Sequence, residues 1–190
     1  IPTDAELEAY VEENRERFLD ELFEYLEIPS ISTDESMKEE VGRCAGWLRD
    51  HLSDIGFKSA EIHQTDGHPI VYAEHCEQPD KPTILIYAHY DVQPPDPLDK
   101  WDSEPFKPEV RDGKIFARGA TDDKGQVYMH VKALETRLRE EAGLPVNVKL
   151  VLEGEEEVGS PSLEPFLREH RERLDCDAVV ISDTGMFARD

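Results

Sequence analysis

The sequence predicts an α/β fold in which a central sheet, largely parallel or mixed, forms a three-layer sandwich with helices on both faces. Two observations support this prediction. Apolar strand-like runs alternate with helical patterns, and the order strand, helix, strand, helix, strand is typical of crossover connections between parallel strands. The chain has 190 residues, 38% of them hydrophobic, which is enough for one domain with an ordinary core.

Two helices are expected at the start of the chain. Apolar residues at helical spacing on a charged background predict an amphipathic helix over residues 4–27, which ends before Pro29. A second helical pattern covers residues 36–55, and Gly56 is in position to end it.

Strands are expected in the middle of the chain. The short runs 59–64 and 70–75 predict strands, and the continuous apolar run 83–95 predicts a buried strand that ends at two prolines. The segment 107–119 contains Asp112-Gly113, a dipeptide that is typical of a hairpin turn.

The last third of the chain predicts helix, strand, helix and strand in turn. A helix is expected over 122–143, because its acidic residues come first and a glycine ends it. A strand over 146–153 follows. The next helix is expected over 160–174, with Ser160 as its N-cap, and the run 177–182 predicts the final strand.

The charge balance restricts the possible partners. Lys and Arg number 21 against 44 Asp and Glu, which gives a formal net charge of -23. Such a surface repels nucleic acid and anionic membranes, so neither is expected as a partner. The N-terminal segment is too charged for a signal peptide, and the three cysteines form no CxxC pair. A cytoplasmic location with reduced cysteines is therefore the default expectation.

Acidic residues and one histidine follow the predicted strands. The carboxyl ends of neighbouring parallel strands meet at one edge of a sheet, where ligands bind in open α/β folds. The residues expected at this edge are His89 and Asp91, Asp122 and Asp123, the cluster Glu153 to Glu157, and Asp183.

This set of residues suits divalent metal ions. Imidazole nitrogen and carboxylate oxygen are zinc-type ligands, and no thiolate is offered. The carboxylates exceed what one tetrahedral ion needs, whereas two ions that share a carboxylate would use them and offset their mutual repulsion. His89 and Asp91 point to the same side of an extended chain, so Asp91 is expected to accept the second ring N–H of His89.

Four segments of the sequence resemble the ordered motifs of the aminoacylase and carnosinase-like dizinc metallopeptidases. They are AHYDVQPP, ARGATDDKGQ, EGEEEVGS and ISDTG. This family also contains carboxypeptidase G and succinyl-diaminopimelate desuccinylase. The segment YAHYDVQPPDPLDKWDSEPFKP is more similar to the branch of cytosolic non-specific dipeptidases than to the deacylases.

The resemblance implies a role for each matching residue. His89 and Asp183 would bind one Zn²⁺, with Asp91 supporting His89 as part of the catalytic set. Asp122 would bridge both ions, and Glu157 would bind the other one. Glu156 would act as the general base, and the peptide bond between Asp122 and Asp123 would be cis. Mn²⁺ or Co²⁺ in place of Zn²⁺ is also compatible with such ligands.

The resemblance also implies parts that these 190 residues do not contain. A C-terminal histidine would complete the second ion, and an inserted lid domain would mediate homodimerisation of the full-length parent. Residues 1–190 are therefore expected to be the N-terminal part of a catalytic domain, with weak or no turnover alone. The expected substrate is a dipeptide or an N-acyl amino acid.

Three alternatives remain open from the sequence. An N-acyl amino acid deacylase would use the same site. A catalytically dead fragment would bind metal alone. An aspartic protease is suggested by VVISDTG, but such enzymes are nearly all β and that assignment leaves His89 unexplained. The remaining histidines are expected to be structural or on the surface: His51, His63, His68, His75, His130 and His170.

Overall fold

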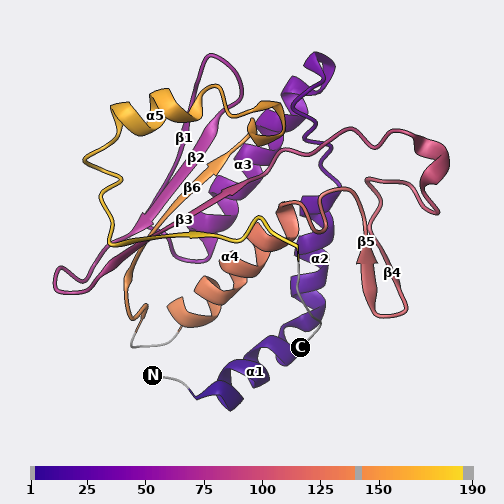
Figure 1. The fold of residues 1–190 in the computed structure, drawn as a ribbon. Coiled ribbons are helices and arrows are strands. Elements are labelled where there is room, and N and C mark those ends of the chain that lie inside the picture. The colour runs from indigo at the N-terminus through magenta and orange to yellow at the C-terminus, as the bar shows by residue number, and fades with distance from the viewer. Residues whose placement is uncertain (1–2, 140–142, 186–190) are drawn as a thin grey trace.

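A computed structural model describes residues 3–139 and 143–185 and confirms the three-layer α/β architecture (Figure 1). The helices are α1 (Asp4–Glu13), α2 (Arg15–Leu26), α3 (Lys38–Asp54), α4 (Lys124–Leu138) and α5 (Leu163–Glu169). The strands are β1 (Ser59–His63), β2 (Ile70–His75), β3 (Thr83–His89), β4 (Glu109–Arg111), β5 (Lys114–Phe116), β6 (Asn147–Glu153) and β7 (Ala178–Ile181).

The central sheet is mixed, with the strand order β1-β2-β6-β3-β7. β3 pairs in parallel with β6 on one side and with β7 on the other. The alternation of strands and helices predicted this parallel part. β1 and β2 form an antiparallel pair, and β2 joins β6 antiparallel, so the parallel core is limited to three strands.

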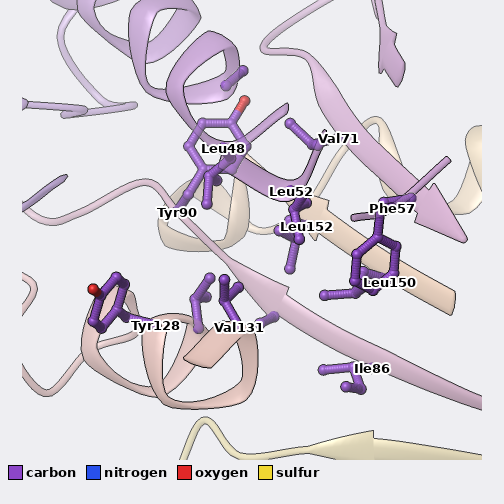
Figure 2. Packing of buried hydrophobic residues seen from close by; sticks show 14 of the residues in the cluster. Leu48, Leu52, Phe57, Val71, Ile86, Tyr90, Tyr128, Val131, Leu150 and Leu152 are labelled. Atoms are coloured by element: carbon purple, nitrogen blue, oxygen red, sulfur yellow. The ribbon is translucent and has the colours of Figure 1, made fainter. Parts of the chain in front are cut away.

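Helices cover both faces of this sheet because alternate strand residues point to opposite sides. One face carries Ile86 of β3 and Leu150 of β6, which pack against α3 and α4 in the larger hydrophobic cluster. Figure 2 shows Leu48 of α3 and Val131 of α4 within this cluster. The opposite face packs Val151 and its neighbours against α5. Full burial of each large side chain contributes about 1.5–3 kcal/mol.

The first predicted helix, 4–27, is divided into two at Asn14. The side-chain amide of Asn14 donates to the Tyr10 carbonyl at 2.8 Å, which supplies a local alternative to continued helical hydrogen bonding. The prediction of one continuous helix was therefore wrong at this residue.

The start of α5 also differs from the prediction. Ser160 has a φ of 53° and its N–H donates to the Glu155 carbonyl at 2.8 Å, so Ser160 closes the preceding turn instead of capping the helix. Ser162 occupies the N-cap position of α5, which begins at Leu163.

The hairpin expected at Asp112-Gly113 is confirmed. Both residues have positive φ values, 50° and 73°, as a tight two-residue turn between β4 and β5 requires. In Figure 1 this hairpin projects away from the central sheet.

Two buried lysines tie the helices together. Lys124, at the start of α4, donates from Nζ to the carbonyl oxygens of Tyr25 at 3.0 Å and Ile28 at 2.7 Å, near the carboxyl end of α2. Lys132 lies further along α4, and its Nζ donates to Glu21 of α2 and lies 2.7 Å from Nε2 of His51 in α3. These bonds satisfy carbonyls and charges that would otherwise be buried without partners.

The three cysteines are free, as expected. Within the part of the chain that the structure describes, no helix combines the length and the apolar character needed to cross a membrane.

Candidate metal centre

His89 ends β3 and its side chain is fully buried. The ring nitrogen Nδ1 lies 3.0 Å from the backbone carbonyl oxygen of Asp91 and 3.3 Å from its carboxylate Oδ1. The other ring nitrogen, Nε2, faces carboxylates: Oδ1 of Asp122 lies at 3.2 Å, Oδ2 of Asp183 at 3.6 Å and Oε2 of Glu156 at 4.0 Å. Nε2 is buried and has no hydrogen-bond partner among the described residues.

His89, Asp122 and Asp183 form a group that fits a divalent cation. One ligand atom from each of the three lies within 4.8 Å of the others. The positions of His89 and Asp183 follow from the topology, because β3 and β7 run parallel and end at the same edge of the sheet, whereas Asp122 lies just before α4. An imidazole nitrogen without a partner, beside two carboxylates, is a donor set for zinc, manganese or cobalt.

The electrostatics around His89 favour a positive charge. Burial lowers the pKa of His89, but the carboxylate of Asp91 and the charges of Asp123 and Asp183 outweigh burial and raise that pKa to about 10. Surroundings that raise the pKa of a buried imidazole are negative enough to attract a divalent cation.

Asp91 contacts more than the ring of His89. Its carboxylate is fully buried, and Oδ1 accepts the backbone N–H of Glu156 at 3.2 Å. Oδ2 accepts the N–H of Glu157 at 3.1 Å. The sequence predicted a contact with His89 alone, whereas the structure shows that Asp91 also fixes the turn after β6.

Glu156 and Glu157 lie on this turn and are both partly exposed. The carboxylate of Glu157 accepts a hydrogen bond from the side-chain amide of Gln93 at 2.7 Å. Burial, together with the nearby charge of Asp122, raises the pKa of Glu157. Glu157 is not one of the three residues grouped around Nε2 of His89, and its assignment to a second ion stays a prediction.

The peptide bond between Asp122 and Asp123 is cis, as the family resemblance implied. The two adjacent carboxylates lie in different surroundings. The side chain of Asp122 is 58% exposed and faces His89. Asp123 is buried, its Oδ2 accepts the His89 backbone N–H at 3.2 Å, and burial raises its pKa to about 6. No separate role for Asp123 could be predicted from the sequence, because its residue type carries no signal of burial.

The acidic run from Glu153 to Glu157 divides into two kinds of residue. Glu153 is buried and accepts hydrogen bonds from Tyr87 and from the Ser160 hydroxyl, the latter at 2.8 Å. Glu155 is buried and accepts the Ser162 backbone N–H at 3.2 Å. Glu156 and Glu157 stay partly exposed. Four neighbouring carboxylates coexist here because two of them are separated from the others by burial and satisfied by hydrogen bonds.

A second acidic group contains His51. Glu21, His51 and Glu135 offer ligand atoms within 4.8 Å of one another, but the Lys132 ammonium lies 2.7 Å from both His51 and Glu135. Burial and the charge of Lys132 lower the pKa of His51 to about 4. A lysine already supplies the positive charge, so this cluster joins helices and is not a metal site.

Sequence similarity to known proteins identifies the family of this chain. Residues 85–189 match the model of peptidase family M20/M25/M40. The chain is 35% identical over 186 residues to the Cys-Gly metallodipeptidase dug1 of Schizosaccharomyces pombe, which covers 92% of this chain and 39% of that protein. It is 34% identical over 188 residues to the human Beta-Ala-His dipeptidase, covering 92% of this chain and 37% of that one.

Solved structures extend the likeness to the fold. The crystal structure of human carnosine dipeptidase 1 superposes with a TM-score of 0.88 and 32% identity, covering 97% of this chain and 42% of that one. The chain thus spans about two fifths of the length of the relatives that it matches.

Proposed function

Because the chain belongs to peptidase family M20/M25/M40, we propose that it contributes the metal centre of a metal-dependent hydrolase acting on dipeptides or related amide bonds. The observation that carries this proposal is the buried Nε2 of His89, which faces Asp122 and Asp183 and lacks a hydrogen-bond partner among the described residues. A nitrogen in such surroundings is costly to bury unless a cation coordinates it or a proton neutralises the carboxylates.

We assign His89 and Asp183 to one Zn²⁺ and Glu157 to a second, with Asp122 shared between them. Mn²⁺ or Co²⁺ would suit the same donors. When bound, such ions polarise a carbonyl and lower the pKa of water. Asp91 orients the ring of His89 through Nδ1 and holds the turn that carries Glu157.

Glu156 is the proposed general base. Its Oε2 lies 4.0 Å from Nε2 of His89, close to the proposed ions without belonging to the group of three. At that position its carboxylate can take a proton from the attacking water and return it to the leaving amine. The backbone N–H of Glu156 is fixed by Asp91, which limits where the carboxylate points.

Both relatives are named as dipeptidases, which supports a dipeptide substrate over an N-acyl amino acid. A cavity of about 880 Å³ opens beside Asp122 and Asp183 and leaves space next to the proposed ions. The helices on both faces of the sheet argue against the aspartic-protease alternative, which requires a nearly all-β fold. The N-terminal position of 1–190 within a catalytic domain, the homodimer and the cytoplasmic location stay predictions.

The proposal is tested by titrating the chain with Zn²⁺ in a calorimeter. We expect Zn²⁺ binding that falls at least about tenfold in His89→Ala, because the imidazole is a ligand. Hydrolysis of a dipeptide and N-acyl amino acid panel, with and without EDTA near neutral pH, then separates the activities. A chain that binds no Zn²⁺, or that binds it equally well without His89, would overturn the proposal, and N-acyl cleavage alone would select the deacylase.

A further inference from the structure

Glu155 is a buried carboxylate to which the proposed function gives no role. Only 5% of its surface is exposed, although the two residues that follow it, Glu156 and Glu157, are partly exposed. Its Oε2 accepts the backbone N–H of Ser162, at the start of α5, at 3.2 Å. Burial of a carboxylate is costly unless specific contacts stabilise it, so the surroundings of Glu155 indicate what it does.

The second contact of Glu155 is with Gly67, in the loop between β1 and β2. A Cβ atom at Gly67 would lie 1.7 Å from Oε1 and 2.7 Å from Cδ of Glu155. The backbone of Gly67 does not adopt a positive φ, so glycine is not required there for its conformational freedom. It is required for space, because the carboxylate of Glu155 occupies the position that any side chain would take.

The backbone of Glu155 organises the turn that follows it. Its carbonyl oxygen accepts the N–H of Val158 at 3.2 Å and of Ser160 at 2.8 Å. Glu156 and Glu157 lie within the turn that these two bonds close, and their own N–H groups donate to the carboxylate of Asp91. The turn is thus held between two buried carboxylates, one facing His89 and the other facing Gly67.

We propose that Glu155 is a positioning residue, which fixes the orientation of Glu156 and Glu157 because its carboxylate packs against Gly67 and accepts the Ser162 N–H. This inference rests on the proposed function, in which those two residues are the general base and a metal ligand. It also gives the β1–β2 loop a part in the site, although no residue of that loop is among the proposed ligands.

Amide hydrogen exchange, followed by NMR, tests the proposal without any metal. In Glu155→Ala the amides of Glu156 and Glu157 should exchange about tenfold faster, while that of Leu150, in the core of β6, should not change. Gly67→Ala should have the same local effect, because its methyl group displaces the Glu155 carboxylate. Glu155→Gln keeps an oxygen acceptor of the same size and should stay within about twofold of the wild type.

The double variant Gly67→Ala/Glu155→Ala distinguishes a direct contact from two separate defects. If the two residues act through one contact, the double variant should exchange no faster than Glu155→Ala alone, because the clash is gone. Gly42→Ala is the matched control: a Cβ at this exposed position of α3 meets nothing within 4 Å, so it should leave both amides unchanged. Equal acceleration at Leu150, additive effects, or unchanged exchange in Glu155→Ala would overturn the proposal.

Titration with Co²⁺ alone links this turn to the metal site. Glu155→Ala should weaken Co²⁺ binding by about tenfold and alter the visible absorption of the bound ion, with both restored in Glu155→Gln. If the wild type bound no Co²⁺, the proposed function would fail, and the exchange pattern alone would decide the role of Glu155. If Co²⁺ binding in Glu155→Ala equalled the wild type, the positioning role would be refuted.

Discussion

Replacing Asp91 by asparagine should weaken both the folded state and metal binding. The two carboxylate oxygens of Asp91 each accept one backbone N–H, from Glu156 at 3.2 Å and from Glu157 at 3.1 Å. Asparagine offers one oxygen, so one of these amides would face an NH₂ group that cannot accept its proton. The ring of His89 would also lose the negative charge at Nδ1.

The expected losses of stability and of Zn²⁺ affinity in Asp91→Asn follow from these contacts. Loss of one buried hydrogen bond to a charged group costs roughly 1.5–3 kcal/mol. For a chain of this size each kcal/mol lowers the melting temperature by about 2–4 °C, so Asp91→Asn should melt about 3–12 °C below the wild type. Loss of a partner that orients a metal-bound histidine lowers metal affinity by about 10–100-fold, so the Zn²⁺ affinity of Asp91→Asn should fall by that factor.

The assays are thermal unfolding followed by circular dichroism without metal, and calorimetric titration with Zn²⁺. Asp102→Asn, in an exposed loop, makes the same chemical change away from the site and should shift the melting temperature by less than about 2 °C. A melting temperature and a Zn²⁺ affinity in Asp91→Asn equal to those of Asp102→Asn would refute the reasoning.

Three further predictions concern other residues. Glu156→Gln should bind Zn²⁺ within about twofold of the wild type, because a base that is not a ligand contributes little to affinity; a tenfold loss in calorimetry would make Glu156 a ligand instead. Acidification from pH 6.5 toward pH 4 should lower the free energy of unfolding. The folded chain holds the pKa of His51 at about 4, below its usual 6.5, so the unfolded chain binds this proton first. Denaturant titrations of His51→Gln should lack this part of the pH dependence. Lys124→Met should cost about 2–4 kcal/mol in the same titrations, since two buried carbonyls near the end of α2 would lose their donor; a loss below about 1 kcal/mol would show that water replaces the ammonium.

The location of the site at one edge of the sheet could be predicted from the apolar runs in the sequence and from the rule that parallel strands end at the same edge. Apolar runs indicated β3, β6 and β7, and parallel pairing brings their carboxyl ends together, so the proximity of His89 and Asp183 could be predicted from these strands. Asp122 lies just before α4, and its place beside them was expected from the start of that predicted helix. The antiparallel attachment of β2 to β6 could not, because a buried strand has the same composition in either direction.

The burial of individual carboxylates was not predictable for a different reason. Glu153, Glu155 and Asp123 have the same residue types as their partly exposed neighbours, and only distant groups such as Tyr87 and Gly67 determine which of them are buried. The misplaced N-cap has a similar cause. Ser160 has the side chain of a good N-cap, but its hydroxyl bonds to Glu153, a contact that spacing along the helix does not reveal.

The position of β3 between β6 and β7 would make binding of a cation depend on the assembly of the sheet. His89 stands at the end of a strand with a neighbour on each side, and each neighbour delivers acidic groups: β6 leads to Glu156 and Glu157, and β7 leads to Asp183. A conformer in which either strand has not docked lacks part of the donor set. An ion would therefore bind tightly only to chains in which β6 and β7 have paired with β3. Metal binding would then stabilise the fully folded state over partly folded ones.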